Sequence, residues 1–258
     1  MNNLLEIKNI CKNYHTKEGE VHAIKDFSFN ISEGQIISLV GPSGCGKSTL
    51  LTIIANIDSE SSGCILKKDD LNIAYMLQSD ALIPWLTIYD NAILGLKIQN
   101  KVTKENLDYV DYLLDFYNLK DFKNNYPKSL SGGMKQRVAL IRTLALKPDL
   151  LLLDEPFSAL DQQSRLLISN DVYKLIKKEK KTVILVTHNI EEAIIFSDVV
   201  IILSKRPSII KNVVNIDIEN KNSIYERRKD KNFHNYFDSI WKDLDLNESW
   251  TKKVFKKN

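Results

Sequence analysis

An α/β fold with a mostly parallel main sheet is predicted by three apolar runs, each of which ends in polar residues. The runs are IISLV at residues 36–40, LLLL at 150–153 and TVILV at 182–186. Continuous apolar runs are typical of parallel strands that are buried on both faces. The carboxyl ends of such strands meet at one edge of a sheet, where ligands bind. The residues that follow these runs are therefore the candidate functional residues.

The composition is that of a globular protein with one buried core. The 258 residues are 43% hydrophobic and 27% charged, which is enough for one domain with an appendage. A net charge of +3 is too small for a dedicated nucleic-acid binder. The three cysteines lie far apart, so we expect no disulfide, no zinc site and a reducing cytosol. We see no signal peptide and no apolar run of about 18–20 residues, so another chain is expected to supply any membrane span.

The first run leads directly into GPSGCGKST, residues 41–49. Gly41, Gly46, Lys47 and Ser48 match the pattern G-x-x-x-x-G-K-[ST], and an apolar helix-like segment follows. Glycines allow backbone amides to close around phosphates. The lysine can reach the β- and γ-phosphates, and the serine hydroxyl can bind Mg²⁺. An ordinary glycine-serine turn would rarely combine this lysine with both flanking elements, so we predict a nucleotide phosphate loop.

The other two runs end in Asp154-Glu155 and in His188. Asp154 is placed to hold Mg²⁺, and Glu155 is placed to polarise a water molecule as a general base. The alternative is a strand that ends in an acidic helix cap. His188 is either a solvated loop residue or a γ-phosphate contact, and its position at a strand end favours the contact. The order of these segments predicts an ATPase or GTPase of the doubly wound class.

The segment from about 78 to 147 has the pattern of a helical insertion. Within it, KSLSGGMKQR at 128–137 has a serine and two glycines at the start of a basic helix. That composition is typical of an anion-binding helix N-terminus. An ordinary N-cap explains the serine equally well. An earlier helix has an apolar face formed by Leu107, Val110, Leu113, Leu114 and Tyr117.

The stretch LSGGMKQRVALIRTLALKPDLLLLDEPFSALD closely resembles the signature-to-Walker-B region of ABC transporter ATPase subunits. The resemblance covers roughly residues 3–215, with the motifs in the expected order. It implies a P-loop NTPase fold of ABC type, with an N-terminal antiparallel β part and a helical subdomain inserted at about 79–147. It also implies an ABC ATPase domain over residues 1–220, followed by a C-terminal helical tail at 221–258.

The resemblance implies that ATP and Mg²⁺ are the ligands and assigns residues to them. Tyr14 matches the aromatic residue that stacks on adenine, although a strand-packing role is the alternative. The implied ATP contacts are Tyr14, Gly41, Pro42, Ser43, Gly44, Cys45, Gly46, Lys47, Ser48 and Thr49, with Ser131, Gly132 and Gly133 acting in trans. The implied Mg²⁺ ligands are Ser48, Gln78 and Asp154, and the implied catalytic residues are Glu155, His188, Gln78 and Lys47.

The in-trans contact implies a head-to-tail dimer, expected to be a homodimer, in which each signature helix binds the γ-phosphate on the partner's phosphate loop. Residues 158–161, SALD, match the loop that crosses to the partner. Ser158 departs from the glycine that relatives usually have there. This departure puts the fine geometry of the loop in doubt, but not its function.

Three short stretches, LIPWLTIYDN, DEPFSALD and LSKRPSII, resemble the ATPase subunits of nitrate, sulfonate and taurine importers. That branch also includes transporters of thiamine-precursor pyrimidines. The resemblance implies a transmembrane permease as partner, an extracytoplasmic substrate-binding protein as an indirect one, no nucleic acid, and a peripheral location on the cytoplasmic face of the membrane. The alternatives are a soluble ABC ATPase and an exporter-type subunit. The apolar segment after Gln78 is either buried core or the docking surface for the permease.

The tail sequence NFHNYFDSIWKDLD predicts a helix with one apolar face. The face is formed by Phe233, Tyr236, Phe237, Ile240, Trp241 and Leu244. It either packs on the parent domain or, with the basic KKVFKKN nearby, contacts anionic lipid headgroups.

Overall fold

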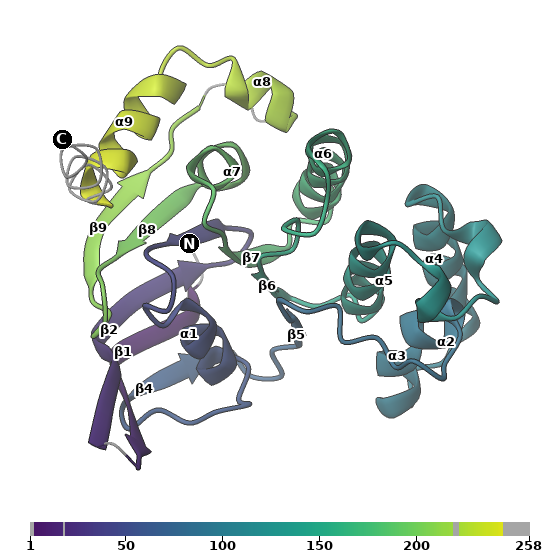
Figure 1. Cartoon of the computed structure of the whole chain (residues 1–258), viewed down its shortest axis with the longest axis horizontal. Helices are drawn as coiled ribbons and strands as arrows, with labels where there is room; N and C mark the ends of the chain where they lie inside the picture. The colour runs from purple at the N-terminus through teal and green to yellow at the C-terminus, as the bar shows by residue number, and fades with distance from the viewer. Residues whose placement is uncertain (1–2, 18, 219–221, 245–258) are drawn as a thin grey trace, which may run out of the picture. The chain divides into compact units, whose positions relative to one another are not determined.

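The computed structural model of the chain describes residues 3–17, 19–218 and 222–244. The chain forms two compact units, one of residues 1–71 with 173–258 and the other of residues 72–172 (Figure 1). The second unit is thus an insertion in the sequence of the first. The predicted boundaries of the helical subdomain, at about 79 and 147, and of the tail, at 221, stay predictions.

The first unit contains a three-stranded antiparallel sheet. Strands β1 (Asn3–Thr16) and β2 (Gly19–Ser32) form a long hairpin, and β4 (Ser62–Lys67) pairs with the other edge of β1. The pairing with β4 covers β1 only from Leu5 to Cys11. Beyond Cys11 the hairpin continues as a ribbon of β1 and β2. This sheet confirms the expected N-terminal antiparallel part.

The same unit contains the parallel strands that the apolar runs predict. Strand β3 (Ile36–Val40) lies between β7 (Thr182–Val186) and β8 (Val199–Leu203), and both pairings are parallel. All residues of these three strands are buried, as expected for strands covered on both faces. Strand β9 (Ile210–Asn215) adds to β8 as an antiparallel edge. The predicted α/β class with a mostly parallel sheet is confirmed.

Helices follow the strand ends of the first unit. Helix α1 (Lys47–Ile54) follows β3, and α7 (Ile190–Phe196) follows β7. Two C-terminal helices, α8 (Ile224–Arg228) and α9 (Phe233–Asp243), pack against α7. The apolar face of α9 is buried or half-buried, which is the packed alternative for this part of the tail. The segment KKVFKKN lies outside the described residues.

A buried arginine fixes the tail helices to α7. Arg227 of α8 has no exposed surface, and its Nη2 donates a hydrogen bond to the carbonyl oxygen of Ile194 at 3.0 Å. The same nitrogen donates to the carbonyl oxygen of Ser197, the C-cap of α7. A cation at a helix C-terminus is stabilised by the helix dipole. The guanidinium also lies 5.7 Å from the centroid of the Tyr173 ring.

The second unit is mainly helical. Its strands β5 (Ile73–Met76) and β6 (Leu150–Asp154) pair in parallel. Its helices are α2 (Ile88–Ala92), α3 (Leu94–Ile98), α4 (Lys104–Phe116) and α5 (Gly132–Leu144), with 3₁₀ turns at Lys120–Phe122 and Pro127–Ser129. Helix α6 (Gln162–Lys178) begins in this unit, and its residues from Tyr173 onward belong to the first. The predicted apolar face of α4 is buried except at Leu107, which is half-buried. Among the described residues of the chain, no helix is both long and apolar enough to cross a lipid bilayer.

Candidate active site

The predicted phosphate loop connects β3 to α1 in the first unit. Gly46, immediately before α1, has a φ of +121°, which side chains rarely allow. A Cβ atom there would lie 3.2 Å from the carbonyl oxygen of Ala23 and 3.3 Å from Cγ1 of Ile24. The loop is also closed by a hydrogen bond from the backbone N–H of Cys45 to the carbonyl oxygen of Pro42 at 3.2 Å. Glycine at position 46 is therefore required both by conformation and by space.

Lys47 lies inside this loop. The residue is 7% exposed, and its Nζ donates hydrogen bonds to the carbonyl oxygens of Gly41 at 2.8 Å and Pro42 at 3.0 Å. Ser43 and Ser48 are exposed. Helix α1 begins without an acidic residue in its first turn and without a side-chain cap, so its N-terminal amides and dipole favour an anion. A glycine-shaped loop, a buried ammonium and an uncapped helix start fit a bound phosphate chain.

Two further members of the loop have definite surroundings. Cys45 is buried, with its Sγ 3.8 Å from Nζ of Lys47. The carbonyl oxygen of Gly44 accepts a hydrogen bond from Nη2 of Arg206 at 2.6 Å. Arg206 follows β8 and lies 162 residues from Gly44 in the sequence. It was not among the predicted site residues, and only its occurrence in the LSKRPSII stretch pointed to it.

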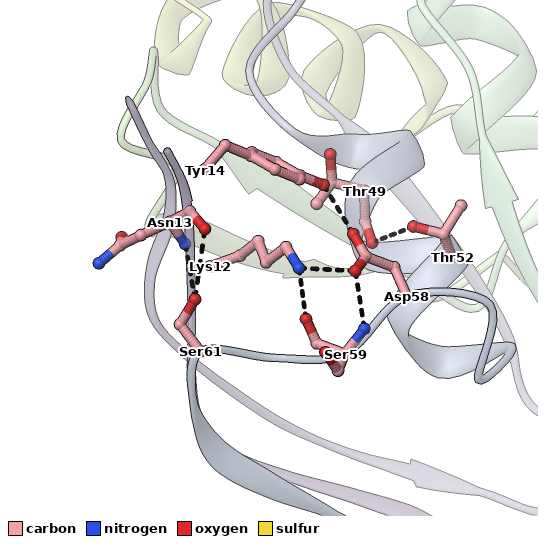
Figure 2. A network of polar contacts seen from close by, with 8 residues as sticks. All are labelled: Lys12, Asn13, Tyr14, Thr49, Thr52, Asp58, Ser59 and Ser61. Carbon is pink, nitrogen blue, oxygen red and sulfur yellow. Dashed lines mark hydrogen bonds and ion pairs between the residues drawn. The ribbon is translucent and has the colours of Figure 1, made fainter. Parts of the chain in front are cut away.

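Tyr14 lies on the β1–β2 ribbon with its side chain partly accessible. The residue is 37% exposed, and its hydroxyl donates a hydrogen bond to Oδ2 of Asp58 at 2.9 Å (Figure 2). Nζ of Lys12 lies 4.8 Å from the centroid of the Tyr14 ring. This tyrosine is therefore not a residue of the hydrophobic core. The contacts of Lys12 and Asp58 with Tyr14 were not predicted, because no sequence motif links Lys12 to Asp58, which lies 46 positions further along the chain.

His188 follows β7 and is exposed at the strand end. The next residue, Asn189, caps α7 by accepting a hydrogen bond from the backbone N–H of Glu192 at 3.1 Å. The backbone N–H of Asn189 in turn donates to Oγ1 of Thr187 at 3.1 Å. The position of His188 is thus set by the start of a capped helix.

In the second unit, Asp154 ends strand β6 and is 2% exposed. The hydroxyl of Tyr75 on the neighbouring strand β5 donates a hydrogen bond to its Oδ2 at 3.2 Å. Burial and the charge of Asp154 raise the pKa of Tyr75, so this hydroxyl stays a proton donor. A buried carboxylate at a strand end is suited to binding a metal ion.

Glu155 adopts a left-handed backbone conformation with a φ of +49°, which is uncommon for a residue with a side chain. Its carboxylate Oε2 accepts a hydrogen bond from Nε2 of Gln78 at 3.2 Å. Two predicted catalytic residues that lie 77 positions apart are thus brought together within this unit. Strained backbone of this kind is concentrated at functional sites.

The carbonyl group of Glu155 connects to the loop that follows it and to α5. It accepts hydrogen bonds from Oγ of Ser158 at 2.9 Å and from Nε2 of Gln136 at 3.2 Å. Oε1 of Gln136 accepts a further hydrogen bond from the backbone N–H of Ala159 at 3.1 Å. Ser158, the departure from the usual glycine, therefore has a local role in fixing this loop. The role of Gln136 was not predicted, because it depends on the buried position of this side chain.

The predicted second anion site begins α5. Ser131 is the N-cap, and its Oγ accepts a hydrogen bond from the backbone N–H of Met134 at 3.3 Å. Gly132 is exposed, and a Cβ atom there would meet nothing within 4 Å. A Cβ atom at Gly133 would lie 3.0 Å from Cδ2 of Leu160, so this glycine allows the 158–161 loop to pack on the helix. The first turn contains no acidic residue.

The loop after Gln78 is held from both ends within the second unit. Arg142 of α5 donates hydrogen bonds to the carbonyl oxygens of Asp80 at 2.8 Å and Ala81 at 2.9 Å. The buried Asn91 of α2 exchanges hydrogen bonds with the backbone of Ile83. Trp85, between these anchors, is 75% exposed. The apolar segment is thus partly core, through α2, and partly an exposed loop with a fixed backbone.

Residues 24–158 of the chain match the ABC transporter family. The uncharacterized ABC transporter ATP-binding protein YtlC of Bacillus subtilis is 42% identical over 93% of this chain and 95% of its own length. The nitrate import ATP-binding protein NrtD of Synechocystis sp. is 36% identical over 92% of this chain and 93% of its own. The taurine import ATP-binding protein TauB of Jannaschia sp. is 39% identical over 79% of this chain and 78% of its own length.

The fold has a solved counterpart as well. The dimeric structure of a post-hydrolysis state of the ATP-binding cassette MJ0796, bound to ADP and Pi, matches with a TM-score of 0.74. The two sequences are 32% identical, and the match covers 83% of this chain and 99% of the MJ0796 chain. Both the predicted family and the predicted fold are therefore confirmed. The chain belongs to the ABC transporter ATP-binding proteins, and it is an ABC ATPase that binds and hydrolyses ATP.

Proposed function

We propose that this chain powers the import of a small solute across a membrane, as the ATPase subunit of an ABC importer. The observation that carries the proposal is its similarity to nitrate and taurine import proteins over most of their lengths. The solute is a small anion of the nitrate, sulfonate or taurine kind, or a pyrimidine like the thiamine precursors. The chain acts at the cytoplasmic face of the membrane, bound to a permease, and a substrate-binding protein delivers the solute to that permease.

Within the first unit, the loop from Gly41 to Thr49 binds the phosphates of ATP, and Tyr14 stacks on the adenine. The buried ammonium of Lys47 supports this assignment, because a cation held among loop carbonyls can transfer its hydrogen bonds to phosphate oxygens. The uncapped start of α1 offers its amides to the same anion. His188 contacts the γ-phosphate.

For hydrolysis, Glu155 accepts the proton of the attacking water, and Gln78 orients that water. The hydrogen bond between their side chains supports a shared task. Asp154, Ser48 and Gln78 hold Mg²⁺, which supplies positive charge to the phosphate oxygens when bound. Among the described residues, no three His, Cys, Asp or Glu side chains gather as a metal cluster. A single carboxylate suffices here, because Mg²⁺ at nucleotides takes one or two carboxylates together with phosphate oxygens.

Two copies of the chain assemble head to tail, and Ser131, Gly132 and Gly133 of each bind the γ-phosphate of ATP on the partner. The exposed, acid-free start of α5 supports this role. The exposed Trp85 loop is the docking surface for the permease, and its fixed backbone would transmit changes at Gln78.

The importer function is tested by purifying the tagged chain from membranes solubilised in mild detergent and identifying its partners. We expect a multi-span permease to co-purify. The complex is then reconstituted in liposomes, and solute movement is measured with ATP on the side of the ATPase. Movement of solute from the face that takes the substrate-binding protein to the face that holds the ATPase supports an importer. Movement in the opposite direction contradicts the proposal, and so does co-purification with ribosomes or DNA.

A further inference from the structure

Tyr14 is placed where the sheet by itself gives little support. Strand β1 pairs with β4 only up to Cys11, and from Lys12 to Thr16 its described ladder partners belong to β2 alone. Two-stranded ribbons are marginally stable in water. A ring on such a ribbon would move relative to the rest of the unit unless other contacts held it.

Those contacts come from the segment that follows α1, as Figure 2 shows. Oδ2 of Asp58 accepts the hydrogen bond of the Tyr14 hydroxyl at 2.9 Å, and its Oδ1 accepts one from Nζ of Lys12 at 2.6 Å. Lys12 is 8% exposed, and its Nζ also donates to the carbonyl oxygen of Ser59 at 2.6 Å. The same ammonium lies over the Tyr14 ring. One carboxylate and one buried cation thus fix both the hydroxyl and the ring.

Asp58 is itself fixed to the helix that begins at the phosphate loop. Its backbone N–H donates to the carbonyl oxygen of Thr52 in α1 at 3.2 Å, and the N–H of Ile57 donates to the same oxygen at 2.9 Å. The backbone N–H of Ser59 closes the turn on Oδ1 of Asp58 at 2.8 Å. Because α1 starts at Lys47, the network joins the Tyr14 ring to the phosphate loop through one rigid helix.

We propose that Lys12 and Asp58 are positioning residues for ATP, which hold the Tyr14 ring at a set distance from the phosphate loop. This inference rests on the proposed contact between Tyr14 and adenine. Tyr14 is 37% exposed and Lys12 lies over its ring, so we expect a base to stack on the ring face opposite Lys12. A ring that is already ordered loses little rotamer freedom when the nucleotide binds, which strengthens binding without a new contact.

The test compares Tyr14→Phe, Asp58→Ala and the double variant in their affinity for ATP, their KM and their kcat. Each single change is expected to raise Kd and KM for ATP by about two- to tenfold, the effect of ordering one side chain, with kcat unchanged. The double variant is expected to resemble Asp58→Ala, because Asp58→Ala already removes the hydrogen bond that Tyr14→Phe removes. Competition by inorganic tripolyphosphate, which has no base, is expected to be unaffected in all three.

Three controls separate the possible outcomes. Glu33→Gln removes a surface ion pair of the same 2.6 Å length, to Lys68, and is expected to leave ATP affinity unchanged. Tyr14→Ala removes the ring and is expected to weaken ATP binding about tenfold or more. Lys12→Met keeps the apolar stem and serves if Asp58→Ala fails to fold.

If Tyr14→Ala weakens ATP binding but Tyr14→Phe, Asp58→Ala and Lys12→Met do not, the positioning role is wrong and the adenine contact stands. If Tyr14→Ala leaves ATP affinity unchanged, the adenine contact is wrong and the positioning role fails with it. Equal losses for ATP and tripolyphosphate would show general damage to the loop, and would also overturn the positioning role.

Discussion

Two helices of this ATPase, α1 and α5, have glycine at or immediately before their first residue and no acidic residue in the first turn, yet their N-termini differ. At α1 the loop is closed on itself, because Gly46 must adopt a positive φ and Lys47 is buried among carbonyl oxygens. At α5 the start is open, because Ser131 caps the helix and Gly132 is exposed with free space around it. The first geometry suits a phosphate cradle that is complete within one unit. The second suits one side of a site, which under the proposed function another chain completes.

The largest effect is expected at Glu155, the proposed general base for hydrolysis at the α1 cradle. Glu155→Gln keeps the shape of the side chain but removes the general base, so kcat is expected to fall by about 10²–10⁴-fold. Binding of ATP is expected to remain, because neither cradle is changed. Steady-state hydrolysis and equilibrium ATP binding measure the two quantities. A variant with near-normal turnover would show that Glu155 is not the base.

A second change separates the two cradles directly. Ser131→Arg places a long cation at the open start of α5 and is expected to abolish hydrolysis by blocking the partner's γ-phosphate. ATP binding by the single chain is expected to persist, because the α1 cradle is untouched. Lys128→Arg, which keeps the positive charge of an exposed residue three positions earlier, is the control. Hydrolysis that survives Ser131→Arg would rule out the in-trans role.

The glycines provide a third and smaller contrast, in stability. Gly46→Ala is expected to lower the free energy of unfolding by about 1–3 kcal/mol, since alanine is strained at a φ of +121°. Gly132→Ala is expected to change it by less than about 0.5 kcal/mol, since the added methyl meets open space. Urea denaturation of both variants provides the comparison. Equal losses of unfolding free energy in the two variants would show that the starts of α1 and α5 do not differ in their need for glycine.

The smallest effect is expected for Asp58, whose ionised carboxylate contributes to folding stability in a pH-dependent way. The hydrogen bond and charge of Lys12 hold the pKa of Asp58 below its ordinary value, so ionised Asp58 stabilises the fold. That stabilisation is fully present above the unfolded pKa of 3.8 and is lost as the pH falls through the lower, folded value. The stability difference between the native chain and Asp58→Asn is therefore expected to be constant from neutral pH to about pH 5 and to narrow below about pH 4. A difference that grows in acid would contradict this sign.

A feature can be predicted from the sequence when the residues that form it lie close together along the chain. Runs such as IISLV predict buried parallel strands, and Lys47 is predicted because its motif lies within nine residues. Gln136, Arg206 and Asp58 were not predicted, because each acts through contacts with residues far along the chain. The left-handed backbone of Glu155 also leaves no mark in composition. Resemblance to a family supplies motif residues, but not the contacts that hold them.

The most direct test of the proposed in-trans ATP site is ATP-dependent assembly, measured by sedimentation velocity. It compares the single variant Glu155→Gln with the double variant that carries both Glu155→Gln and Ser131→Arg. We expect the first variant to become dimeric when ATP is added, since hydrolysis no longer separates the copies. We expect the double variant to bind ATP with similar affinity but to stay monomeric, since the open start of α5 is blocked. A double variant that still dimerises with ATP would contradict the claim that the signature helix of one chain completes the ATP site of the other.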